Sequence, residues 1–171
     1  MSFIGIITEN RNEICVKKII DKNIKEIKVE SIIIKDKNIE NMKNIKFETI
    51  LICGNNTPVL EKTEVLKKII SNAKFLIINS DIDTNLNVLN NMNLTVISFG
   101  FNQKSSITAS SVDDDSILVC VQRNIKDINQ KIIEPQEIRV EIENKNAACN
   151  THNLMGCICA SLIYGKKHIV I

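Results

Sequence analysis

Short apolar runs alternate with longer amphipathic segments over the first hundred residues of the chain. Four apolar runs have the length of β-strands, at residues 3–8, 49–53, 75–79 and 94–99, and VESIII at 29–34 is also predicted to be a strand. The segments between them predict helices, at residues 14–19, 38–43 and 60–71 and in a short stretch from Asp83 or Thr84 to Leu89. This alternation predicts an α/β fold, in which a mostly parallel sheet carries helices on its faces.

The second half of the chain has a different pattern, with short strands joined by polar turns. We expect strands at residues 106–112, 116–122, 131–133 and 137–142, with the three aspartates 113–115 at a hairpin turn. A helix is expected at 150–164, capped by Asn150 or Thr151 and ended by Gly165, and a last strand at 168–171. One domain is therefore predicted, with a parallel part (1–100), an antiparallel β-hairpin part (101–149) and a terminal helix and strand (150–171).

Composition agrees with a single folded domain and excludes several classes. The chain has 171 residues, of which 44% are hydrophobic and 25% are charged. A net charge of +2 without a basic cluster argues against a nucleic-acid partner. No apolar run approaches the roughly 20 residues of a membrane span, and the first residues lack the basic region of a secretory signal. We therefore expect no membrane association, a cytoplasmic protein, and six cysteines present as reduced thiols.

Several motifs stand in a definite order along this pattern. They are IGIITENRNEIC at 4–15, FETILI at 47–52, LIINSD at 76–81, VISFG at 96–100 and THNLMGCICA at 151–160. Together they resemble the central, ATP-binding domain of the Mur ligases, the ATP-dependent amide-bond-forming enzymes of peptidoglycan precursor synthesis. The resemblance implies a P-loop-like fold of the kind seen in that central domain. It also implies N- and C-terminal domains, for which 171 residues leave no room.

The first motif departs from the family pattern where the phosphates would bind. In the family a glycine-rich loop lets backbone N–H groups wrap the phosphates, a Lys neutralises charge, and a hydroxyl holds Mg²⁺. Here Thr8 and Arg11 replace glycines, Asn12 replaces the Lys, and Glu13 replaces the hydroxyl residue. A glutamate in such a loop repels phosphate. We therefore interpret the loop as vestigial; it consists of Thr8, Glu9, Asn10, Arg11, Asn12 and Glu13.

Two further groups of residues are candidates for a nucleotide or ligand side. Asn79, Asp81 and Asp83 follow a strand, where open α/β sheets bind ligands, although a turn and a helix cap favour the same residue types. The family's Asp-His pair after the third strand is absent, and GNNTP stands there at 54–58. In the late motif His152 and Asn153 survive, and the resemblance implies that His152 contacts a purine. The alternative interpretation is that His152 is only a hydrogen-bonding group at a helix end.

A metal site is not expected. Cys149, His152, Cys157 and Cys159 resemble a ligand set in composition. In a helix, however, Cys157 and Cys159 lie about 200° apart around the axis and cannot share one ion.

The sequence thus favours a reduced, non-catalytic Mur ligase-like domain, or pseudoenzyme, that acts as a binding or assembly module, in a cell-envelope setting implied by the resemblance. No cofactor is expected. The alternative is an ADP-forming, Mur-type amide ligase or a nucleotide-dependent transferase that uses ATP and Mg²⁺ and is completed by a partner chain. A third hypothesis is a small-ligand or partner-binding domain that uses loops 54–58 and 79–84. Surface left by the lost neighbouring domains favours a protein partner or a homo-oligomer.

Overall fold

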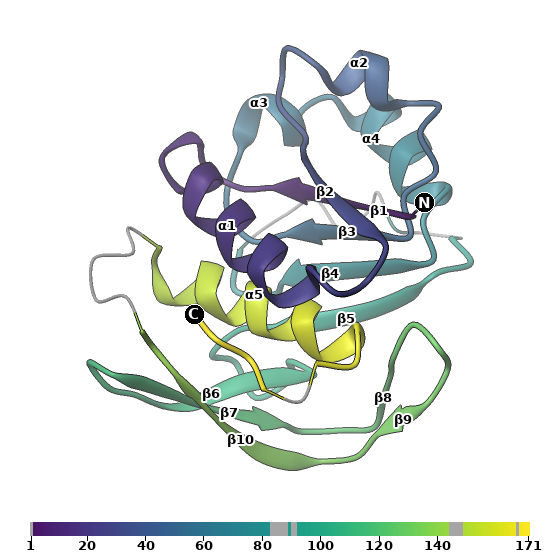
Figure 1. Cartoon of the computed structure of the whole chain (residues 1–171). Coiled ribbons are helices and arrows are strands. Elements are labelled where there is room, and N and C mark those ends of the chain that lie inside the picture. The colour runs from purple at the N-terminus through teal and green to yellow at the C-terminus, as the bar shows by residue number, and fades with distance from the viewer. Residues whose placement is uncertain (1, 83–88, 90–91, 144–148, 167) are drawn as a thin grey trace.

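The computed structural model describes residues 2–82, 89, 92–143, 149–166 and 168–171, and its centre is an eight-stranded sheet (Figure 1). The strand order is β10-β7-β6-β5-β4-β3-β1-β2. Five strands form the parallel part, namely β1 (Ser2–Ile7), β2 (Val29–Ile33), β3 (Thr49–Ile52), β4 (Phe75–Asn79) and β5 (Thr95–Phe99). The expected α/β class is confirmed.

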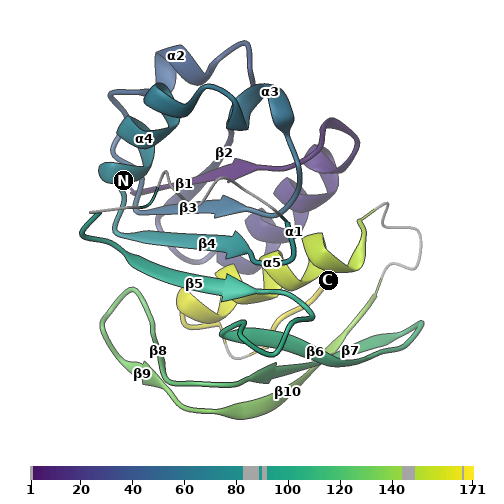
Figure 2. The same ribbon diagram turned by 180° about the vertical axis from the view of Figure 1, so that it is seen from behind.

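Helices cover both faces of this parallel part, as the two opposite views show (Figures 1 and 2). On one face lie α1 (Glu13–Ile24) and α5 (Thr151–Ile163), which pack against each other. The other face carries α2 (Ile39–Met42), α3 (Thr57–Leu60) and α4 (Thr63–Ser71). The central strands β3 and β4 are buried along their whole length, which explains why they are continuous apolar runs rather than alternating ones.

Helix α5 lies beside α1 on the same face, packs against strands β3 to β6, and is buried on nearly all sides. Its Gly156 faces the sheet, and a Cβ there would lie 2.8 Å from the Cys53 sulfur and 3.0 Å from the Phe99 ring. A glycine is therefore required for the helix to approach the strands this closely.

The antiparallel part continues the same sheet, as the sequence led us to expect. β6 (Ile107–Val112) pairs with β5 in parallel through one residue pair, Phe99 with Ile107. β7 (Ser116–Val121) and β10 (Gln136–Glu141) then add in antiparallel fashion. Between these last two strands, β8 (Ile125–Lys126) and β9 (Ile132–Ile133) form a separate small hairpin.

Local signals were mostly confirmed. The Asn150 side chain accepts a 2.9 Å hydrogen bond from the Asn153 N–H at the start of α5, and Gly165 ends the helix region with a φ of +77°. The Asp113 N–H donates to the Ser116 carbonyl at the tip of the β6–β7 hairpin.

Three local predictions had other outcomes. The expected strand at 168–171 is reduced to one bridge between Val170 and Glu141. The helix at 60–71 is divided, because Pro58 starts the short turn α3 before α4 begins. The helix expected from residue 84 to 89 lies outside the described residues, apart from Leu89 itself. In the described part of the chain, no helix is long and apolar enough to cross a membrane.

Candidate functional site

The candidate residues gather at the carboxyl edge of the parallel strands. The loops after β1, β3, β4 and β5 meet there, together with the N-terminus of α5. Connections across this edge join segments far apart in sequence, since the Thr8 hydroxyl donates a 2.9 Å hydrogen bond to Oδ1 of Asn153. The amide of Asn56 likewise donates to the Thr8 carbonyl (2.9 Å). The loop after β1 is thus held against both the loop after β3 and the start of α5.

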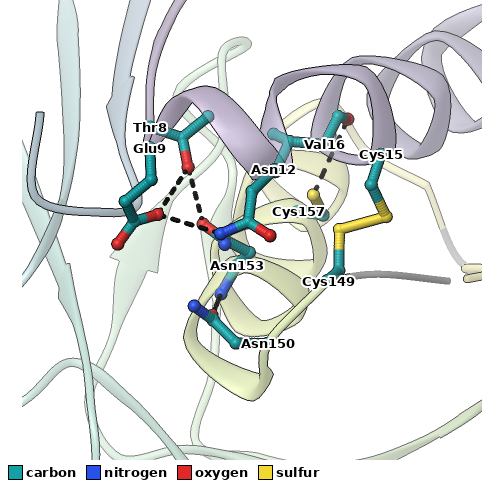
Figure 3. The surroundings of a disulfide bond; sticks show 9 residues. All are labelled: Thr8, Glu9, Asn12, Cys15, Val16, Cys149, Asn150, Asn153 and Cys157. Carbon is teal, nitrogen blue, oxygen red and sulfur yellow. Dashed lines mark hydrogen bonds between the residues drawn. A yellow bond between two sulfur atoms is a disulfide. The ribbon is translucent and has the colours of Figure 1, made fainter.

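The side chain of Glu9 turns back over its own loop (Figure 3). Its Oε2 accepts a hydrogen bond from Nδ2 of Asn12 (3.1 Å) and a longer one (3.2 Å) from the hydroxyl of Thr8, whose single proton it shares with Oδ1 of Asn153. Its Oε1 accepts one from the backbone N–H of Asn55 (3.2 Å). A carboxylate is therefore bound by donors of two loops, of the kind that a phosphate would otherwise use.

Gly54 makes room for this arrangement. A Cβ at Gly54 would overlap the Glu9 carboxylate, so a side chain there would displace it. Burial alone would raise the pKa of Glu9, but the hydrogen bonds from Asn12, from the backbone N–H groups and from Thr8 hold that pKa below its usual value. The carboxylate is consequently a fixed negative charge at neutral pH.

The other residues of the predicted phosphate loop take different places. Asn10 to Asn12 form a single 3-10 turn, in which Arg11 is exposed. Glu13, which we expected to face the phosphates, instead lies buried in the first turn of α1 and pairs with Lys35. One of its oxygens, Oε1, is buried without a hydrogen-bond partner. The expectation that Glu13 faces the phosphates is therefore wrong, and it is the Glu9 side chain that reaches over the loop.

A second group forms where β4 and β5 end. Asp81 accepts hydrogen bonds from the backbone N–H of Phe101 (2.6 Å) and from Nδ2 of Asn102 (2.9 Å), and it contacts Nε2 of His152 at 3.0 Å. The Phe101 ring meets the His152 ring edge to face, with centroids 5.0 Å apart. Burial would raise the pKa of Asp81, yet the hydrogen bonds, led by the Phe101 N–H, lower it below the usual value.

The structure thus brings together Asp81 and His152, which the sequence singled out separately. Asn79 lies next to them but is committed to the fold, because its Nδ2 donates to the Cys53 carbonyl (3.1 Å) and its Oδ1 accepts from the Asp81 N–H. Asn153 is fully buried, and its Nδ2 has no hydrogen-bond partner. Asp83 lies outside the described residues.

Sequence reasoning missed two participants at this edge. Phe101 and Asn102 supply contacts to Asp81, although neither carries a recognisable motif. The only signal was their position in loops that follow parallel strands.

Two cysteines correct the expectation of six reduced thiols. Cys15 in the first turn of α1 and Cys149, just before α5, form a disulfide bond beside the Glu9 loop (Figure 3). Packing of α1 on α5 places their Cα atoms 6.0 Å apart, a normal separation for this bond. The other four cysteines are free; burial raises the pKa of the Cys53, Cys157 and Cys159 thiols, which makes them unreactive at neutral pH.

The described residues hold no group of three or more His, Cys, Asp or Glu side chains that would bind a metal ion. Cys149, which appeared in the ligand set considered from the sequence, is committed to the disulfide bond.

No protein-family model matches this sequence, and no curated protein matches it at a significant level. Solved structures do match, among them the UDP-N-acetylmuramate:L-alanyl-gamma-D-glutamyl-meso-diaminopimelate ligase from Neisseria meningitides. The TM-score is 0.65 at 10% sequence identity, over 95% of this chain and 61% of that chain. The chain therefore spans about three-fifths of the structure that it resembles, and the likeness establishes a Mur-ligase-like fold.

Proposed function

We propose that this Mur-ligase-like domain is a non-catalytic binding or assembly module, whose loop after β1 no longer accepts a nucleotide phosphate. The observation that carries the proposal is the Glu9 carboxylate, bound by Asn12, Thr8 and the Asn55 N–H. These donors are already used by an anion that belongs to the chain. The resemblance extends the proposal to a role linked to cell-envelope metabolism.

Electrostatics supports this proposal. A phosphate charge about 4 Å from a fixed carboxylate is repelled by about 4 kcal/mol at the effective dielectric constant of a protein surface. The loop has no lysine to offset this repulsion, and Lys35 is paired with Glu13. Arg11 is exposed, and its side chain stands where a phosphate loop needs a glycine so that the phosphate can approach the backbone closely. A phosphate would thus have to displace the Glu9 carboxylate. It would also lack the positive charge that a phosphate loop normally supplies.

The competing function is an ADP-forming ligase completed by a partner chain. The observation that favours it is the paired and partly exposed His152 beside Phe101, at the same edge of the sheet. Under that function, Arg11 would supply the positive charge that neutralises the phosphates.

Calorimetric titration with ATP and Mg²⁺ at millimolar nucleotide distinguishes the two functions. We expect no saturable binding to the wild-type protein and no release of ADP when amino-acid or peptide acceptors are added. Saturable binding that Arg11→Ala weakens would contradict the proposal and support the ligase. The Glu9→Gln variant tests whether repulsion by the carboxylate is what excludes phosphate, since it removes the charge at nearly constant shape. Pyrophosphate binding by Glu9→Gln but not by the wild type would show that the carboxylate is what closes the loop.

A further inference from the structure

One edge of the eight-stranded sheet is formed by β10, and both views show this strand at the margin of the molecule (Figures 1 and 2). An edge strand presents unpaired backbone N–H and C=O groups, which can pair with another strand. Proteins commonly protect such an edge with charges of one sign, which repel a second copy. Here the two exposed charged residues of the central part of the strand, Glu137 and Arg139, have opposite signs.

The hydrogen-bonding pattern shows which backbone groups are open. The Ile142 N–H donates to the Asp115 carbonyl on the β7 side, whereas the Glu141 carbonyl and the Glu143 N–H bond to Ile171 on the opposite side. The N–H and C=O groups of successive residues point to opposite sides of a strand. Gln136, Ile138 and Val140 therefore bond to β7, and the N–H and C=O groups of Glu137 and Arg139 face outward.

We propose that two copies of this chain associate by antiparallel pairing of their β10 strands, about a two-fold axis at Ile138. In this register Glu137 lies opposite Arg139 of the second copy, and Arg139 lies opposite Glu137. Both residues have outward backbone groups, so each pair exchanges two backbone hydrogen bonds, as antiparallel geometry requires. Each pair also places opposite charges across the strands on one sheet face.

The ends of the free edge agree with this register. Pro135 precedes the strand and has no N–H to donate, so pairing cannot extend in that direction. At the other end, Glu141 is already paired with the chain's own Ile171. The free groups are thus confined to the two residues that the two-fold register uses. On the other sheet face, the half-buried Ile138 meets Ile138 of the second copy.

Sedimentation equilibrium over a range of protein concentrations tests the pairing. The wild type should form a dimer that weakens as salt is raised. Glu137→Arg or Arg139→Glu alone turns two attractive pairs per dimer into repulsive ones, and should raise the dissociation constant about tenfold. The double variant Glu137→Arg/Arg139→Glu restores both pairs with reversed polarity, and should restore dimerisation. Glu40→Arg, on the exposed surface of α2, is the matched control and should leave the dimer unchanged.

A cross-linking experiment tests the register itself. In the proposed pairing the two residues 138 form a non-hydrogen-bonded pair, with Cα atoms about 4.5 Å apart. Ile138→Cys should therefore give an intermolecular disulfide bond under mild oxidation. Gln136→Cys lies on the same face, but its two copies would be about 13 Å apart along the strands, and it should not cross-link.

A wild type that remains monomeric at about 1 mM, a dimer that is insensitive to both charge reversals, or equal cross-linking at positions 136 and 138 would each overturn the proposal. Near-ultraviolet circular dichroism of each variant confirms that its fold is retained.

Discussion

The disulfide bond between Cys15 and Cys149 should supply a large part of the stability of this domain. It joins residues 134 positions apart, and it ties the first turn of α1 to the segment that enters α5. Closing a loop of this length lowers the entropy of the unfolded chain, and the chain-entropy relation gives about 5 kcal/mol at 25 °C. For a domain of this size, that corresponds to a fall of about 10–20 °C in melting temperature when the bond is lost.

Urea denaturation of the oxidised wild type, the dithiothreitol-treated wild type and the Cys15→Ser/Cys149→Ser variant measures this contribution. We expect the two forms without the bond to lose similar free energies of unfolding. Dithiothreitol should not affect the double variant, because its four other cysteines are free. This variant is therefore the control for nonspecific effects of the reductant.

Thiol titration of the unfolded, oxidised protein provides an independent check and should find four reactive thiols. Six thiols would refute the bond itself. A double variant within about 1 kcal/mol of the oxidised wild type would refute the argument from loop closure, even if the bond forms.

Two further predictions concern the carboxyl edge of the parallel strands. The pKa values of Glu9 and Asp81 are lowered in the folded protein, so their stabilising contribution is present at neutral pH and is lost as pH falls through the folded values. We therefore expect the free energy of unfolding, measured from about pH 6 to about pH 3, to fall less steeply for Glu9→Gln/Asp81→Asn than for the wild type. An equal fall in the two proteins would contradict the lowered pKa values of these two carboxyl groups. At the start of α5, Asn150→Ala removes the hydrogen bond to the Asn153 N–H and should cost about 1 kcal/mol, whereas Asn150→Asp retains an acceptor and should cost less.

The framework of this fold was accessible from the sequence because it depends on local periodicity. The run FLIIN predicted β4 from Phe75 to Asn79 without error, because a strand buried on both faces is a continuous apolar run. The end of α5 was also predictable, since Gly165 adopts the left-handed conformation that a glycine accommodates without strain. These signals lie within a few residues of the structure they determine.

The site was less accessible because its contacts join distant segments. Glu9 bonds to Asn55, Thr8 to Asn153, and Cys15 to Cys149, and no local pattern reports such pairs. An alignment to a phosphate-loop motif assigns a role to every loop position from its order alone. It therefore placed Glu13 toward the phosphates, whereas the first turn of α1 directs that side chain to Lys35 and leaves Glu9 free to fold back.

The two features that the sequence did not reveal act on the same piece of backbone. The disulfide bond fixes the first turn of α1 to the start of α5, and the Glu9 cluster fixes the preceding turn to the loop after β3. Under the proposed function, we expect a loop held at both ends to admit a phosphate only when one of these constraints is released. The two constraints are of different kinds, because a reductant breaks the covalent one while the Glu9→Gln substitution weakens the electrostatic one. Pyrophosphate titration of the wild type and of Glu9→Gln, each with and without dithiothreitol, therefore separates repulsion by charge from closure by geometry. If charge is what excludes the anion, Glu9→Gln binds pyrophosphate in both redox states and the reduced wild type still does not.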